Sequence, residues 1–285
     1  MPAHTSAVGS DLDVNIVEMT ARKALAYAAG IADTTAEVFD DDRADGIVAP
    51  PPFCVSLEWP VVSGPLSRSA LGMTPGERIR GVHASQDSVF HQPIRPSMKL
   101  ECRGRIVGAR RTRAGTYTLS KLETVEVGSA VPVVTSWSSS IVRDVEVVGE
   151  DTMLETPPPL PEGGGEVLAE VEILIPREMP HTYTECADIW NPIHTEREVA
   201  LAAGLPDIIL HGTATWALAG REVIRLCCDG DPARLKRLYG RFTAMVIPGQ
   251  PIRVEVRQPV DGAVGFTVYN HQDEAAVSGG LAVVG

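Results

Sequence analysis

A proline- and glycine-rich segment near the middle of the chain limits what this sequence can fold into. Residues 155–165 contain four prolines, Pro157 to Pro159 and Pro161, followed by the glycines Gly163 to Gly165. Proline runs are extended and glycine runs are flexible, so this composition cannot pack a core. The segment predicts a linker between residues 1–154 and residues 166–285. Two parts of similar length invite a search for an internal duplication.

The two halves show the same order of features. Each begins with a short helical stretch around a tyrosine: residues 21–29, which Thr20 can cap and Gly30 can end, and residues 183–188. Each then has a short apolar element, at residues 47–53 and 208–212. The repetition favours two related folding units.

Alternating apolar and polar residues follow in both halves. Residues 98–107 and 252–257 alternate, which predicts strands of an antiparallel sheet with one buried face. Further strands are expected at residues 117–120, 131–138, 266–269 and 281–284. Runs of strands that follow helical segments indicate the α+β class.

The second half also contains a long amphipathic helix, expected over residues 212–227. Trp216, Ala219, Val223 and Cys227 recur at helical spacing, whereas Arg221, Glu222 and Arg225 are expected to face water. Small residues along this helix would let a sheet approach closely. An antiparallel sheet wrapped around a helix is therefore the architecture expected of each half.

Composition excludes several functional classes. The 285 residues carry a formal net charge of −12, which argues against a nucleic-acid partner. No apolar stretch is long enough to span a membrane, and the residues from Met1 to Thr5 do not resemble a signal peptide. The five cysteines form no C-x-x-C pair, and together these features predict a reduced, cytoplasmic protein.

Candidate catalytic residues gather in one stretch of the second half. A short helix is expected over residues 191–204, because Asn191 suits the N-cap, Pro192 the first turn and Gly204 the end. This would place His194 at a helix N-terminus, where the helix field favours a neutral imidazole that can act as a base.

Two further groups could complete such a site. Asp188 lies just upstream, so its carboxylate and His194 could converge on one water molecule. Gly212 follows His211 and opens the long helix, where a backbone N–H could stabilise an oxyanion. The alternatives are simple helix capping by Asn191, a surface His194 and a core His211. A metal site is not expected, because the spacing of these residues matches no ligand pattern.

The same residues resemble a known family. Residues 188–194 and 209–212, Asp-Ile-Trp-Asn-Pro-Ile-His and Ile-Leu-His-Gly, resemble the hydratase-2 motif of the MaoC-like (R)-specific enoyl-CoA hydratases and dehydratases. Residues 27–33 and 48–53 more loosely resemble the amino-terminal domain of that superfamily. The resemblance implies a double hot-dog fold, with two antiparallel sheets that each wrap a long central helix. The first half would then be a non-catalytic wall for the acyl chain.

The resemblance also implies a reaction. The substrate would be a coenzyme A thioester, and water would add reversibly to a trans-2-enoyl-CoA to give an (R)-3-hydroxyacyl-CoA. The catalytic residues would be Asp188 and His194, and Asn191, His211 and Gly212 would bind the substrate. The family implies no further cofactor, and a homodimer is a possible assembly.

One departure from the motif leaves alternatives open. The family's aspartate stands two places before the asparagine, and this place is occupied here by Ile189. Either Asp188 reaches the site through a local kink, or Glu185 replaces it, or the acid role is lost. A hot-dog thioesterase and a non-catalytic acyl-CoA-binding or partner subunit are the alternative functions.

Overall fold

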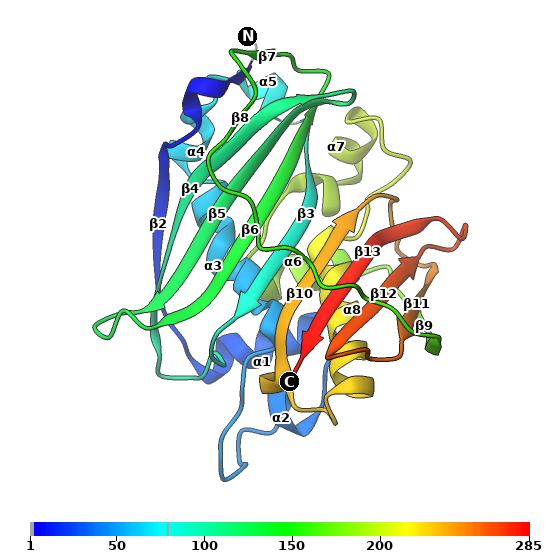
Figure 1. The fold of residues 1–285 in the computed structure, drawn as a ribbon. Helices are drawn as coiled ribbons and strands as arrows, with labels where there is room; N and C mark the ends of the chain where they lie inside the picture. The colour runs from blue at the N-terminus through cyan, green and yellow to red at the C-terminus, as the bar shows by residue number, and fades with distance from the viewer. Residues whose placement is uncertain (1–2, 79) are drawn as a thin grey trace.

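Strands from both halves of the chain join edge to edge in one eleven-stranded sheet (Figure 1). The computed structural model describes residues 3–78 and 80–285. Residues 1–2, part of the start examined for a signal peptide, lie outside the described residues. The strand order is β2-β4-β5-β6-β3-β10-β13-β12-β11-β9, with β8 paired to β4. All neighbours in this order are antiparallel, and this sheet with its helices confirms the expected α+β class.

The first half supplies one side of the sheet and several short helices. Its strands are β1 (Ala3–His4), β2 (Asp11–Glu18), β3 (Gly81–Phe90), β4 (Lys99–Thr112), β5 (Gly115–Glu126), β6 (Pro132–Arg143), β7 (Val147–Val148) and β8 (Thr152–Met153). Its helices are η1 (Thr5–Ala7), α1 (Ala21–Gly30), α2 (Ala36–Phe39), η2 (Pro51–Phe53), α3 (Cys54–Val62), α4 (Pro65–Ala70) and α5 (Pro75–Arg78). As expected, Thr20 caps α1 by accepting a hydrogen bond from the Lys23 N–H.

The second half supplies the other side of the sheet. Its strands are β9 (Val167–Leu174), β10 (Leu235–Phe242), β11 (Pro251–Arg257), β12 (Ala263–Tyr269) and β13 (Ala275–Val284). Its helices are α6 (Met179–Ala187), η3 (Pro192–His194), α7 (Arg197–Ala202), α8 (Gly212–Cys227) and η4 (Pro232–Arg234). The long helix α8 has the bounds that the sequence predicts, and it packs on β10 to β13.

The central helices of the two halves differ in length. Helix α8 has 16 residues, whereas α3 has nine and contains Pro60. Gly220 lets α8 approach the sheet closely, since a Cβ at this position would lie 2.8 Å from the Leu238 side chain. Both helices cover the same face of the sheet, and a single cluster of buried apolar residues extends through both halves.

The two halves meet where β3 pairs with β10. Tyr239 lies opposite Asp87 in this register, and Arg237 lies opposite Val89. The Arg237 guanidinium donates two hydrogen bonds to the Asp87 carboxylate, at 2.8 and 2.7 Å, and both side chains are buried. A buried, bidentate ion pair therefore fixes the seam between the halves.

The linker lies along the outer face of the sheet rather than hanging free (Figure 1). Residues 155–165 contain no helix or strand. Arg237 nevertheless donates to the carbonyls of Pro158 and Pro159, and Arg257 donates to the carbonyl of Gly165. Because the linker is held by these contacts, it crosses from β8 to β9 in an extended path.

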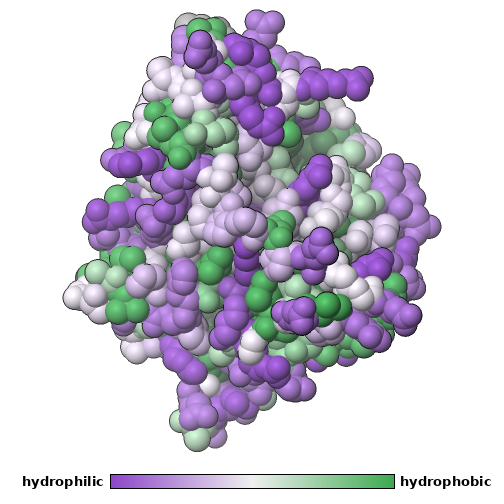
Figure 2. Space-filling view, viewed as in Figure 1, coloured by the Kyte–Doolittle hydropathy of each residue, from purple (hydrophilic) through white to green (hydrophobic). Residues whose placement is uncertain are grey.

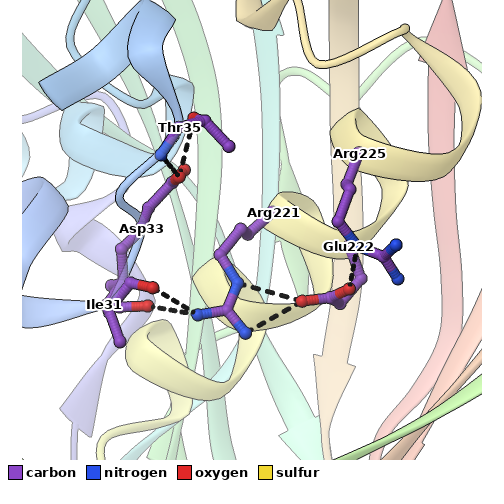
Figure 3. A network of polar contacts seen from close by, with 7 residues as sticks. Ile31, Asp33, Thr35, Arg221, Glu222 and Arg225 are labelled. Carbon is purple, nitrogen blue, oxygen red and sulfur yellow. Dashed lines mark hydrogen bonds and ion pairs between the residues drawn. The ribbon is translucent and has the colours of Figure 1, made fainter. Parts of the chain in front are cut away.

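A second polar contact joins the halves behind the sheet (Figure 3). Arg221 of α8 donates to the carbonyls of Ile31 and Ala32 in the first half, at 2.8 and 2.9 Å, and it pairs with Glu222. The sequence placed Arg221 and Glu222 in water, and this expectation is wrong. Glu222 is buried, because the end of α1 covers this part of α8.

The surface of the molecule differs in character from its buried apolar core. On the face in Figure 2, hydrophilic residues are spread between small, separate apolar patches. Among the described residues, no helix has both the length and the apolar character that a membrane crossing requires.

Candidate active site

His194 ends a short turn that Asn191 begins. The Asn191 side chain accepts a hydrogen bond from the Ile193 N–H, and Pro192 occupies the first position of the 3₁₀ turn η3. The predicted continuous helix over residues 191–204 is wrong. Glu196 adopts an extended conformation, with φ −108° and ψ 107°, so η3 ends before α7 begins at Arg197. His194 therefore lies at the end of a turn rather than at the start of a helix.

The hydrogen bonding of His194 fixes its protonation. Its Nδ1 lies 2.8 Å from the carbonyl oxygen of Ile209. A carbonyl oxygen can only accept, so in the neutral ring Nδ1 carries the proton and Nε2 keeps its lone pair. Burial lowers the pKa of His194 to about 4. The imidazole is neutral, as the sequence predicts, but the cause is desolvation instead of a helix field.

His211 stacks directly on His194. The two ring centroids are 3.7 Å apart, with 23° between the ring planes. His211 is 3% exposed, and its Nε2 lies 3.3 Å from the Thr184 hydroxyl. Burial, together with the neighbouring His194, lowers the pKa of His211 well below its usual value. Two neutral imidazoles thus stack at the start of α8.

Gly212 opens α8 as expected. The first N–H groups of a helix have no acceptor within that helix, and among the described residues no side chain caps this end. The Phe242 ring lies over Gly212, since a Cβ at this position would be 3.0 Å from the ring. The start of α8 can therefore offer backbone N–H groups to an oxygen atom that carries developing charge.

The structure does not bring Asp188 to His194. Asp188 ends α6 in the left-handed conformation, with φ 55° and ψ 40°, and its side chain is exposed. The next residue, Ile189, is 5% exposed and occupies the inward-facing place. Among the described residues, the Asp188 carboxylate makes no hydrogen bond or ion pair. The expectation that a kink carries this carboxylate to His194 is therefore wrong for this structure, because the chain reversal turns Ile189 inward instead.

Glu185, the alternative acid, is also exposed, on α6. Asn191 lies next to His194, as the spacing requires. The site that the chain does assemble consists of His194, His211, Asn191 and the start of α8. Within the described part of the chain, no group of three or more His, Cys, Asp or Glu residues could hold a metal ion.

Sequence reasoning missed two buried tyrosines beside the site. Tyr183 of α6 packs against His211, with ring centroids 5.0 Å apart, and its hydroxyl lies 3.2 Å from that of Thr213. Tyr27 of α1 reaches Tyr183 from the first half, with 3.3 Å between the two hydroxyl oxygens. The signal was available, because each half begins with a helix around a tyrosine.

Comparisons with known families agree with this architecture. Residues 162–273 match the model of the MaoC like domain. Residues 6–136 match the model of the FAS1-like, dehydratase domain region. The two matches cover most of both halves and leave residues 137–161 between them.

Individual proteins with similar sequences match shorter stretches. The chain is 36% identical over 95 residues to a probable enoyl-CoA hydratase 2 of Dictyostelium discoideum, covering 33% of this chain and 32% of that protein. It is 40% identical over 67 residues to the peroxisomal enoyl-CoA hydratase 2 of Arabidopsis thaliana, covering 24% and 22%. The chain therefore spans about a third or less of the length of these curated relatives.

Solved structures resemble the whole chain. A MaoC-like dehydratase from Phytophthora capsici superposes with a TM-score of 0.86 at 23% identity, covering 99% of this chain and 97% of that one. A Mycobacterium tuberculosis protein described as a double hot-dog fold gives a TM-score of 0.66 at 14% identity, covering 97% and 96%. The expected double hot-dog fold is confirmed. The chain thus carries a MaoC-like domain in its second half and a FAS1-like dehydratase region in its first.

Proposed function

We propose that this protein catalyses the reversible addition of water to a trans-2-enoyl-CoA, giving an (R)-3-hydroxyacyl-CoA. The family and the relatives named enoyl-CoA hydratase 2 support this reaction. The observation that carries the proposal is the hydrogen bonding of the neutral His194 ring. Its Nδ1 donates to Ile209, which leaves Nε2 as a base next to the start of α8.

One imidazole can perform both proton transfers. In the hydration direction, His194 Nε2 takes a proton from water while the water oxygen forms a bond to C3. The electron pair of the C2–C3 double bond shifts towards the thioester oxygen, where the Gly212 N–H would stabilise the negative charge. The imidazolium then returns its proton to C2 on the same face, and the base is regenerated.

The remaining site residues would support this base. The Asn191 cap holds the turn that ends at His194, and the stacked His211 ring restricts the rotation of His194. We assign no proton transfer to Asp188, because its exposed carboxylate does not contact His194. The proposed mechanism thus uses one base where the family motif implies a pair.

Substitutions at the two candidate residues test this mechanism. His194→Gln should lower the turnover of crotonyl-CoA or a longer enoyl-CoA by about a hundredfold or more, because a general base contributes at least this much. Asp188→Asn should keep turnover within about threefold of the wild type. Loss of the enoyl absorbance measures the rate, and His271→Gln on the exposed surface is the matched control.

Other outcomes would identify the alternative functions. Full activity of His194→Gln would remove the base from the mechanism, and an inactive Asp188→Asn would restore the two-residue mechanism. Release of free thiol from a saturated acyl-CoA, without hydration of any enoyl-CoA, would indicate a thioesterase. Tight acyl-CoA binding without turnover would indicate a binding or partner subunit.

The setting of this reaction is also part of the proposal. The coenzyme A thioester is the substrate, and the chain's own residues supply the chemistry without a further cofactor. The five cysteines are free, which suits the reducing cytoplasm. A homodimer is the assembly that we propose, since β2 and β9 leave unpaired edges at the two ends of the sheet.

A further inference from the structure

Tyr27 is a first-half residue with a fixed hydrogen-bonding arrangement. Its side chain is completely buried, and its hydroxyl donates to the carbonyl oxygen of Pro52 at 2.9 Å. A phenol has one proton, so this bond leaves the Tyr27 oxygen as an acceptor. The hydroxyl of Tyr183 lies 3.3 Å away and can donate to it. Tyr27 therefore offers the Tyr183 hydroxyl one oriented acceptor across the boundary between the halves.

Tyr183 in turn contacts the site itself. Its single proton is shared between two acceptors, the Tyr27 oxygen and Thr213 Oγ1, which lies 3.2 Å away in the first turn of α8. Its ring packs against His211, which stacks on His194 at 3.7 Å. Tyr183 and His211 are both almost completely buried, so neither ring can move without displacing a neighbour.

We propose that Tyr27 is a positioning residue for the active site, acting through Tyr183 on His211 and thereby on the base His194. This inference rests on the proposed hydratase function. It gives the first half a part in catalysis beyond forming a wall for the acyl chain. Tyr27 does not touch the reacting atoms, and its effect comes from holding Tyr183 at one orientation.

Proton transfer tolerates little displacement of the base, and this is the physical reason why a positioning residue can affect the rate. Proton transfer needs Nε2 within hydrogen-bond distance of the water, and small displacements of a catalytic group lower the rate strongly. Without the Tyr27 oxygen, the buried Tyr183 hydroxyl keeps only one acceptor for its proton, Thr213 Oγ1. The first turn of α8 and the stacked histidines would then lose a restraint, although the substrate would still bind.

The variant Tyr27→Phe tests this inference, because it removes the hydroxyl and keeps the ring. We expect kcat for enoyl-CoA hydration to fall about tenfold, the free energy equivalent of one buried hydrogen bond, with KM within about twofold of the wild type. Tyr117→Phe is the matched control, since the ring of Tyr117 on β5 packs under Arg110 of β4, away from the site.

A double-mutant cycle separates positioning from general stability. If Tyr27 acts through Tyr183, the double variant Tyr27→Phe/Tyr183→Phe should lose no more activity than Tyr183→Phe alone. Additive losses would overturn the inference, as would an unchanged kcat in Tyr27→Phe. A fall in melting temperature with kcat intact would show a purely structural role and would also overturn it.

The remaining outcomes distinguish a failure of this inference from a failure of the proposed function. If Tyr27→Phe does not fold, Tyr183→Phe is the test. A fall of about tenfold in its kcat would support positioning of His194 through Tyr183, and a kcat equal to that of the wild type would overturn it. A wild-type protein that hydrates no enoyl-CoA would overturn both this inference and the proposed function. An active wild type with unaffected variants would overturn the role of Tyr27 only.

Discussion

Glu58 is a carboxyl group enclosed in the core of the first half. It lies on α3 and is 4% exposed. Gln86 donates to its Oε2 at 2.9 Å and Ser136 donates to its Oε1 at 2.5 Å. Burial raises the pKa of Glu58 to about 7, because the two hydrogen bonds offset only part of the desolvation cost. Glu58 is therefore partly protonated in the neutral pH range, unlike a surface glutamate.

Glu58 should make the stability of the protein depend on pH. The folded pKa lies above the unfolded value of 4.5, so its stabilising contribution is complete below about pH 4.5 and is lost as the pH rises through about 7. Relative to the wild type, Glu58→Gln should therefore gain up to about 3 kcal/mol between pH 5 and pH 8. Urea unfolding at both pH values measures this, and an equal difference at both would contradict it.

At the scale of elements, the seam between β3 and β10 depends on one ion pair. Asp87 and Arg237 are buried together, and Arg237 also donates to two carbonyl groups of the linker. Strand pairing, the ion pair and the linker therefore meet at one place. An isolated buried charge is costly, so the two side chains depend on each other.

Removing one partner of this pair should destabilise the whole chain. Arg237→Ala leaves Asp87 buried without compensation, and we expect a loss of about 3–5 kcal/mol in the free energy of unfolding. Arg253→Ala is the control, because the ion pairs of Arg253 with Glu170 and Asp273 lie at the surface and should be worth less than about 1 kcal/mol. Equal losses in a denaturant titration would show that the seam is not held by this pair.

At the scale of the whole molecule, the two hot-dog units form one folding body. They share a continuous sheet and one hydrophobic cluster. Arg221 and the Tyr27–Tyr183 contact add polar links behind the sheet. The linker follows an extended path across the outer face, so it connects the units without separating them.

Cutting the linker should therefore leave the halves together. A specific-protease site placed at residues 160–162 would break the chain, and these residues are exposed. Because the β3–β10 pairing and the shared core remain, both fragments should elute as one species at the size of the intact chain. The uncut protein with the same insertion is the control. Fragments that separate in size-exclusion chromatography would show that the linker itself holds the halves together.

Some strands were visible in the sequence and others were not. Residues of β4 and β11 alternate between apolar and polar because one face of each strand is more buried than the other, and this pattern is local. Strands β3 and β10 carry buried polar residues such as Gln86 and Arg237, whose partners come from distant segments. Their pattern is therefore not apolar on one face, and they were missed although they join the two halves.

The sequence by itself determined the features that rest on neighbouring residues: the bounds of α8, the cap of α1, the composition of the linker and the placing of Asn191 beside His194. The tertiary structure decided the rest. It set the tautomer of His194 through the Ile209 carbonyl, turned Ile189 inward in place of Asp188, and brought Tyr27 to Tyr183. The reason is that capping and periodicity act within a few residues, whereas burial and hydrogen-bond partners are fixed only when distant segments pack together.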